Sequence, residues 1–161
     1  MAATSALDAK DVAILVALQE DGRQSLSALG RRIGLSQPAM SERVKRLEDL
    51  GIITGYTAKV SLPALGLTMM AMIRLRTSHA QIRSCLKRFG ELPNIVEVHR
   101  VTGDDCFVLK AIVPAPEDLA GIVDGIGEFG AVTTSLVLKS ETVKPIGPSL
   151  LAQASHRGRR R

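Results

Sequence analysis

Apolar residues in the first 60 positions recur at intervals of three and four, the spacing that places them on one face of a helix. Helix-capping residues and glycine breaks bound three such stretches: Asp8 to Asp21-Gly22, Ser25 to Gly34, and Ser36 to Gly51. Ser and Asp side chains accept hydrogen bonds from the first free N–H groups of a helix, and glycine permits the sharp turn that follows. The pattern therefore predicts three helices, the last two joined by a tight turn.

The period of the pattern changes after a stretch with proline and glycine at 61–68, which we interpret as a linker. We expect residues 52–60, just before it, to form a short extended segment, either a wing or a linker strand. Beyond the linker we expect strands over 69–76, 95–101, 106–113 and 131–143, and helices over 80–89 and 117–129. We expect Ile82, Leu86 and Phe89 to form the buried face of the first of these helices.

The order βαββαβ is that of a ferredoxin-like split sandwich, an antiparallel sheet with both helices on one face. The sequence thus predicts an α+β protein, with an N-terminal winged helix-turn-helix domain followed by a ferredoxin-like βαββαβ sandwich domain. We expect the first domain over 1–60, the linker over 61–68, the sandwich over 69–147 and a basic disordered tail over 148–161. Met70 and Met72 extend apolar character onto the uncovered sheet face, which favours an oligomer interface there.

Charge is concentrated in two segments, although the chain as a whole has a net charge of only +5. Residues 23–46 contain six Lys or Arg and one acid, Glu42, and residues 144–161 contain five Lys or Arg and no acid. A cation-rich block confined to one small helical subdomain is typical of phosphate contact. The scarcity of aromatic residues, 2%, argues against binding of single-stranded nucleic acid, which uses aromatic stacking.

Several functional classes find no support in the sequence. Cys85 and Cys106 match neither a zinc spacing nor a disulfide framework, so we expect no metal, no cofactor and a reducing compartment. No apolar run is long enough to cross a bilayer, and we see no secretory signal. We therefore expect a cytoplasmic protein without membrane contact. A Cys106–His99 pair lacks an orienting third group, so we expect no catalytic residue and no enzyme.

Three segments of the sequence resemble the Lrp/AsnC, or feast/famine, family of transcription regulators. The resemblance rests on LDAKDVAILVALQEDGR, on LSALGRRIGLSQPAMSERVKRLEDLGIITGYTAKV, and on VTGDDCFVLK between the central strands. It implies a homodimer formed through the C-terminal domain, often assembled into an octamer or larger ring. It also implies double-stranded DNA as a partner and a free amino acid bound between neighbouring sensing domains. Cys106 stands where many members have an acid, so the effector pocket differs in polarity.

The basic segment supplies the candidate DNA contacts. Ser36, Gln37 and Ser41 lie near the start of the third helix, where side chains reach base edges. We expect the arginines and the lysine nearby to contact mainly phosphates, which set register without reading sequence: Arg31, Arg32, Arg43, Lys45 and Arg46. Arg43 sits close to the buried stripe, so its stem would have to reach outward. A charge run can also be only a solvated face.

The turn between the two central strands supplies the candidate effector contacts, although Gly and Asp also favour ordinary turns. A zwitterion needs an anion for its ammonium group and N–H or hydroxyl donors for its carboxylate. We expect these from six residues: Gly103, Asp104, Asp105, Thr133, Thr134 and Ser135.

The sequence thus predicts a DNA-binding transcriptional regulator modulated by an amino acid or a related small effector. The alternative is a ligand-independent DNA-organising protein of the same fold. The final RGRRR is either a solubilising tail or a nonspecific DNA-binding arm, and the sequence favours neither.

Overall fold

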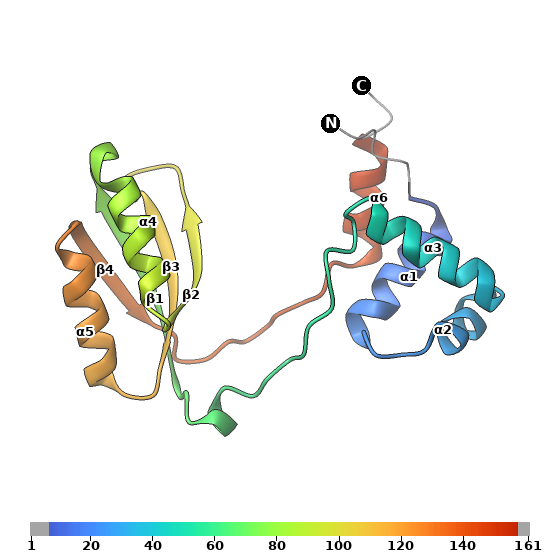
Figure 1. Cartoon of the computed structure of the whole chain (residues 1–161), viewed down its shortest axis with the longest axis horizontal. Helices are drawn as coiled ribbons and strands as arrows, with labels where there is room; N and C mark the ends of the chain where they lie inside the picture. Colours follow the sequence, from blue (N-terminus) through green and yellow to red (C-terminus); the bar gives the residue numbers. More distant parts are fainter. Residues whose placement is uncertain (1–6, 158–161) are drawn as a thin grey trace. The chain divides into compact units, whose positions relative to one another are not determined.

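The computed structural model describes residues 7–157, which divide into two compact units (Figure 1). The first unit combines residues up to Lys59 with those from Thr142 onward, and the second is Val60–Glu141. The C-terminal segment thus belongs to the first unit.

The first unit is built on the three predicted helices, α1 (Ala9–Glu20), α2 (Leu26–Ile33) and α3 (Gln37–Asp49). Their caps are those expected from the sequence, because the side chains of Asp8, Ser25 and Ser36 each accept a hydrogen bond from a first-turn backbone N–H. The aliphatic stripes of the helices meet in a core of buried residues: Ile14, Leu15, Ala17, Leu29, Met40, Val44 and Leu47. A helix-turn-helix arrangement is therefore confirmed.

The predicted wing does not form a strand. Residues 52–60 have no regular secondary structure, and only Ile52 and Ile53 pack against the helical core. The extended segment expected from composition therefore lacks a neighbouring strand within its own unit with which to exchange backbone hydrogen bonds.

The predicted tail is also corrected. Residues expected to be disordered form helix α6 (Pro148–Arg157), and Leu151 packs on the core of the first unit. Residues 158–161 lie outside the described part of the chain. The predicted domain limits shift accordingly, since the second unit ends at Glu141 rather than at residue 147.

The second unit has the predicted βαββαβ order. Its elements are β1 (Met69–Thr77), α4 (Ile82–Glu91), β2 (Ile95–Arg100), β3 (Phe107–Val113), α5 (Pro116–Gly127) and β4 (Gly130–Leu136), with short 3-10 turns η1 (Pro63–Leu65) and η2 (His79–Gln81). The strands form one antiparallel sheet in the order β2-β3-β1-β4. Helices α4 and α5 cover one face of this sheet, and the other face is open within the unit (Figure 1).

Two details of the second unit differ from expectation. Ile82 and Phe89 pack on the core as expected, but between them Cys85 is buried and Leu86 is 46% exposed, because the sheet contacts the side of the helix that carries Cys85. Strand β4 ends at Leu136, where its pairing with β1 ends, instead of reaching residue 143. In the described part of the chain no helix is long and apolar enough to span a bilayer.

Candidate functional site

A tight turn fixes the geometry between α2 and α3. Gly34 adopts a left-handed conformation with φ 74°, and the N–H of Leu35 donates to the carbonyl of Gly30 at 2.9 Å. A Cβ at Gly30 would lie 2.7 Å from the Leu35 carbonyl oxygen, so the close approach requires glycine there. The Lys10 ammonium donates to the carbonyl of Ile33 and so ties α1 to the end of α2.

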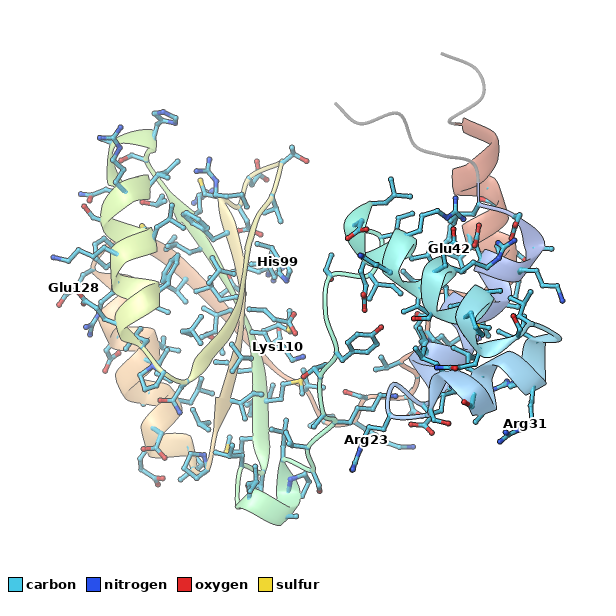
Figure 2. The ribbon with its side chains drawn as sticks, turned by 45° about the vertical axis from the view of Figure 1, so that its right-hand side comes forward. Arg23, Arg31, Glu42, His99, Lys110 and Glu128 are labelled. Carbon is cyan, nitrogen blue, oxygen red and sulfur yellow. The ribbon has the colours of Figure 1, made fainter. Side chains whose placement is uncertain are left out.

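The N-terminal end of α3 presents small polar side chains to solvent. Ser36, Gln37 and Ser41 are exposed, as is Lys45 one turn further along. Arg31 and Arg32 are exposed on α2, and Arg31 points away from the helices (Figure 2). The predicted contact residues on the two helices thus lie on accessible surface, except for Arg43 and Arg46, which are partly buried.

The carboxylate of Asp11 forms ion pairs with both partly buried arginines of α3. This side chain is fully buried, and it accepts a hydrogen bond at 2.9 Å from Arg43 Nη1 and another at 2.5 Å from Arg46 Nη2. Arg43 also donates to Asp8 Oδ2 at 2.6 Å. Although desolvation opposes it, hydrogen bonds from the Asp11 backbone and from Arg43 lower the pKa of Asp8, and the two carboxylates raise the pKa of Arg43.

Sequence reasoning missed this network. Asp8 was identified only as a helix cap and Asp11 was not singled out as a contact residue, yet both join α1 to α3 across more than 30 residues of sequence. Arg32 is likewise paired, with Glu20 at 2.6 Å. A guanidinium has five N–H donors, so an arginine in such a network can still donate to a phosphate.

The turn between β2 and β3 lies beside a charged residue of the sheet. Gly103 has φ 107°, and Asp104 is exposed at the turn. The carboxylate of Asp105 lies 4.0 Å from Arg74 Nε on β1, and Thr133 is the cross-strand partner of Arg74. The predicted Asp105 and Thr133 thus flank Arg74, a residue that was not among the predicted effector contacts.

The remaining predicted effector residues divide between the two faces of the sheet. Ser135 is opposite Met72, on the same open face as Thr133 and Arg74. Thr134 is opposite the buried Ile73, so its side chain points to the helix-covered face, where its hydroxyl is buried without a hydrogen-bond partner in the described part of the chain. Strand alternation therefore separates Thr134 from its two neighbours.

The open sheet face carries a further charged cluster. Glu97 accepts hydrogen bonds at 2.8 Å from Lys110 Nζ and at 3.3 Å from His99 Nε2, and these two partners lower the pKa of Glu97. His99 and Lys110 project from the side of the sheet opposite α4 (Figure 2). His99 thus pairs with a carboxylate rather than with Cys106, whose Sγ donates to the Thr77 carbonyl at 3.1 Å.

The sulfur and metal chemistry of the described residues is limited. Burial raises the pKa of the Cys85 thiol, and no group of three or more metal-ligating side chains occurs among the residues that the structure describes.

Family comparisons agree with both halves of this architecture. The AsnC-type helix-turn-helix domain matches residues 7–48, and the Lrp/AsnC ligand binding domain matches residues 68–145. The chain belongs to the Lrp/AsnC family. Lrp/AsnC proteins are helix-turn-helix transcriptional regulators, so this chain is a DNA-binding regulator with a ligand-binding domain and not an enzyme.

Individual Lrp/AsnC relatives match over nearly their whole length. The chain is 34% identical over 143 residues to the regulator YezC of Bacillus subtilis, covering 86% of this chain and 99% of that protein. The structure of B. subtilis LrpC has a TM-score of 0.82 at 30% identity, covering 86% of this chain and 99% of that one. A Neisseria meningitidis regulator in complex with L-Met has a TM-score of 0.76 at 28% identity, covering 87% and 97%.

Proposed function

We propose that this regulator binds duplex DNA through α3 and that a free amino acid, or a related small effector, changes its affinity for DNA. The observation that carries the DNA part is the exposed polar N-terminus of α3, where Ser36, Gln37 and Ser41 face solvent after a rigid turn. Short hydroxyl and amide side chains at this end of a helix are suited to base edges in the major groove.

Phosphate contacts in this proposal come from the surrounding cations. Arg31 and Lys45 are exposed and have the greatest freedom to reach the DNA backbone. Arg32, Arg43 and Arg46 are held by acids, so their spare donors would meet phosphates in a fixed orientation. Such contacts position the protein on the duplex, whereas the serines and the glutamine select the sequence.

The effector part rests on opposite charges at the edge of the open sheet face. Asp105 offers an anion for an ammonium group, and Arg74 offers a planar fork of donors for a carboxylate. At 4.0 Å the two groups are only loosely paired, and both are partly exposed, so an amino-acid zwitterion can replace that contact with two better ones. The hydroxyl of Thr133 on the neighbouring strand is a third donor. The L-Met complex of the N. meningitidis relative supports an amino-acid ligand.

A homodimer, assembled into an octamer or a larger ring, is part of the same proposal. The open face displays Met70 and Met72 beside the polar residues, and apolar surface of this kind is stable when a second copy covers it. Two copies related by a two-fold axis would hold two α3 helices at the spacing of a pseudo-palindromic DNA site.

A thermal-shift screen of the wild-type chain against the free amino acids tests the effector site. A ligand that binds only the folded state raises the melting temperature, by an amount that grows with ligand concentration. We expect at least one amino acid to do so for wild type, and we expect Asp105→Asn to abolish the shift. Asp124→Asn, an exposed carboxylate on α5, should keep it. The absence of any shift for wild type favours the ligand-independent DNA-organising alternative.

A further inference from the structure

An acidic residue, Glu42, lies near the middle of α3 (Figure 2). Its side chain is exposed, and helical spacing places it opposite the residues that α3 buries, Met40, Val44 and Leu47. Ser41 and Lys45, both proposed to contact DNA, are also exposed on this helix. The helix that we propose to enter the major groove thus presents a carboxylate among its polar and basic side chains.

The carboxylate of Glu42 has no hydrogen-bond or ion-pair partner in the described part of the chain, whereas neighbouring acids have partners. Glu20 pairs with Arg32 at 2.6 Å, and Asp11 holds two arginines of α3. Arg46 follows Glu42 by four residues, the spacing of a helical ion pair, but its Nη2 lies 2.5 Å from the Asp11 carboxylate instead. No ion pair within the described residues therefore offsets the negative charge of Glu42.

The stability of α3 does not explain this carboxylate either. An acid stabilises a helix mainly in the first turn, beside the free N–H groups, and α3 has no acid there. Glu42 is the sixth residue after the Ser36 cap. On a surface that approaches DNA phosphates, an unpaired carboxylate opposes binding because like charges repel. Glu42 favours DNA binding only where the duplex supplies a hydrogen-bond donor.

The major groove supplies such a donor at cytosine. An ionised carboxylate only accepts hydrogen bonds, and the edge of cytosine presents the N4 amino donor. Guanine presents two acceptors, thymine presents the O4 acceptor, and adenine places the N7 acceptor beside its N6 donor. A carboxylate in the groove therefore pairs well with cytosine and is repelled by the acceptor atoms of the other three bases. A serine hydroxyl, which both donates and accepts, discriminates less.

We propose that Glu42 is a specificity-determining residue of α3, whose carboxylate accepts a hydrogen bond from the N4 amino group of a cytosine in the bound duplex. This inference rests on the proposed function, because it assigns a base to the same helix. Glu42 lies in the N-terminal half of α3, the part of a recognition helix that contacts base edges. Its charge penalises every site that lacks the cytosine, so the contact increases selectivity by weakening the wrong complexes.

Selection from a pool of duplexes with a randomised central segment tests the assignment. The full chain is mixed with the pool, and the retained duplexes are sequenced. We expect wild type to select cytosine at one position in each half of the site, and Glu42→Ala to lose the preference at that position alone. Glu42→Gln should change the preference from cytosine to adenine, because an amide pairs with the N6 and N7 atoms of adenine.

Asp49→Ala is the matched control for the loss of charge. Asp49 is an exposed acid on the same helix, seven residues and about 10 Å further along the axis, near the C-terminal end. Both alanine variants should bind an arbitrary duplex slightly more tightly than wild type, because each removes one negative charge. Replacing the selected cytosine by thymine should weaken binding about fivefold or more for wild type and for Asp49→Ala, and hardly at all for Glu42→Ala.

The outcomes separate this inference from the proposed function. Base preferences of Glu42→Ala that equal those of wild type overturn the inference and leave the DNA-binding function in place, as does a Glu42→Gln variant that still selects cytosine. Loss of the cytosine preference in Asp49→Ala also overturns the inference, because it indicates a general charge effect. A wild-type chain that retains no duplex even at low salt overturns the proposed function and the inference together.

Discussion

At the scale of single residues, the buried carboxylate of Asp11 determines the orientation of Arg43 and Arg46 on α3. Its two oxygens accept from Arg43, from Arg46 and from the backbone N–H of Asp8, so every charged group in the network has a partner. The side chains of Arg43 and Arg46 are 30% and 40% exposed. The network therefore fixes the angle between α1 and α3 and presents two oriented guanidinium groups at the protein surface.

Removing the central charge should destabilise the first unit. We expect Asp11→Asn to lower its free energy of unfolding by about 2–4 kcal/mol, at the lower end if both arginines turn fully into water. Chemical denaturation followed by circular dichroism measures the change. Asp49→Asn, an exposed acid at the end of α3, is the control and should stay within about 0.5 kcal/mol of wild type. Equal stabilities for Asp11→Asn and wild type would contradict the role of the network.

The lowered pKa of Asp8 predicts a loss of stability in acid. In the unfolded chain this carboxyl takes up a proton near its ordinary pKa of 3.8. In the folded chain desolvation opposes ionisation, but hydrogen bonds from the Asp11 backbone and from Arg43 outweigh it and keep the carboxyl ionised to lower pH. Its contribution is therefore fully present above the unfolded pKa and disappears as the pH falls through the folded pKa. Wild type should exceed Asp8→Asn in stability at neutral pH, and the two should converge in strong acid. Asparagine is a good helix cap, so a difference that is independent of pH would contradict this assignment.

Residues that act within one helical turn could be predicted from the sequence, whereas partners from distant helices could not. The caps at Asp8, Ser25 and Ser36 follow from local hydrogen bonding between a side chain and the N–H groups two or three residues later. The pairing of Arg43 with Asp11 depends on how α1 crosses α3, and periodicity says nothing about that angle. Arg74 beside Asp105 was missed for the same reason, since the pairing of the strands sets that distance.

At the scale of elements, hydrophobic alternation predicted the sheet but not the C-terminal helix. Strands β1 and β3 have alternating or continuous apolar positions that are buried as expected. A ten-residue helix such as α6 is marginal in water by itself, so its existence depends on docking. The hydrogen bond of Gln19 to Ile146, just before the helix, joins residues 127 positions apart, and Leu151 packs on a core formed by residues 14–47. A local pattern contains no signal for them.

The two adjacent leucines of α6 provide a matched test of docking. Leu151 packs on the core and Leu150 is 56% exposed. We expect Leu151→Ala to lower the free energy of unfolding of the first unit by about 1–3 kcal/mol, less than for a fully buried leucine, and Leu150→Ala to change it by less than about 0.5 kcal/mol. Denaturant titration measures both. Equal effects would contradict the packing of α6 on the helix-turn-helix.

At the scale of the whole molecule, the open sheet face connects the proposed ligand site to the proposed assembly. We expect the wild-type chain to be a dimer or larger in solution, and Met72→Glu to dissociate it by placing a charge on that face. Leu86→Glu, on an exposed position of α4, is the control and should leave the assembly intact. Analytical ultracentrifugation measures the mass. Dissociation by both variants, or by neither, would contradict an interface on the open face.

An effector bound near Asp105 can alter DNA binding only if its affinity differs between the DNA-bound and DNA-free arrangements of the assembly. The proposed DNA contact and the proposed ligand site belong to different compact units, since one unit contains α3 and the other contains the charged pair of Arg74 and Asp105. The coupling free energy in such systems corresponds to roughly 5- to 150-fold changes in affinity.

The most direct measurement is the affinity of the full chain for the DNA upstream of its own gene, with and without the amino acid that raises its melting temperature. The proposed function predicts a change in Kd of about fivefold or more for wild type. It also predicts DNA binding by Asp105→Asn that no longer responds to the amino acid. A wild-type Kd that stays the same with every free amino acid at saturating concentration would contradict effector control of DNA binding.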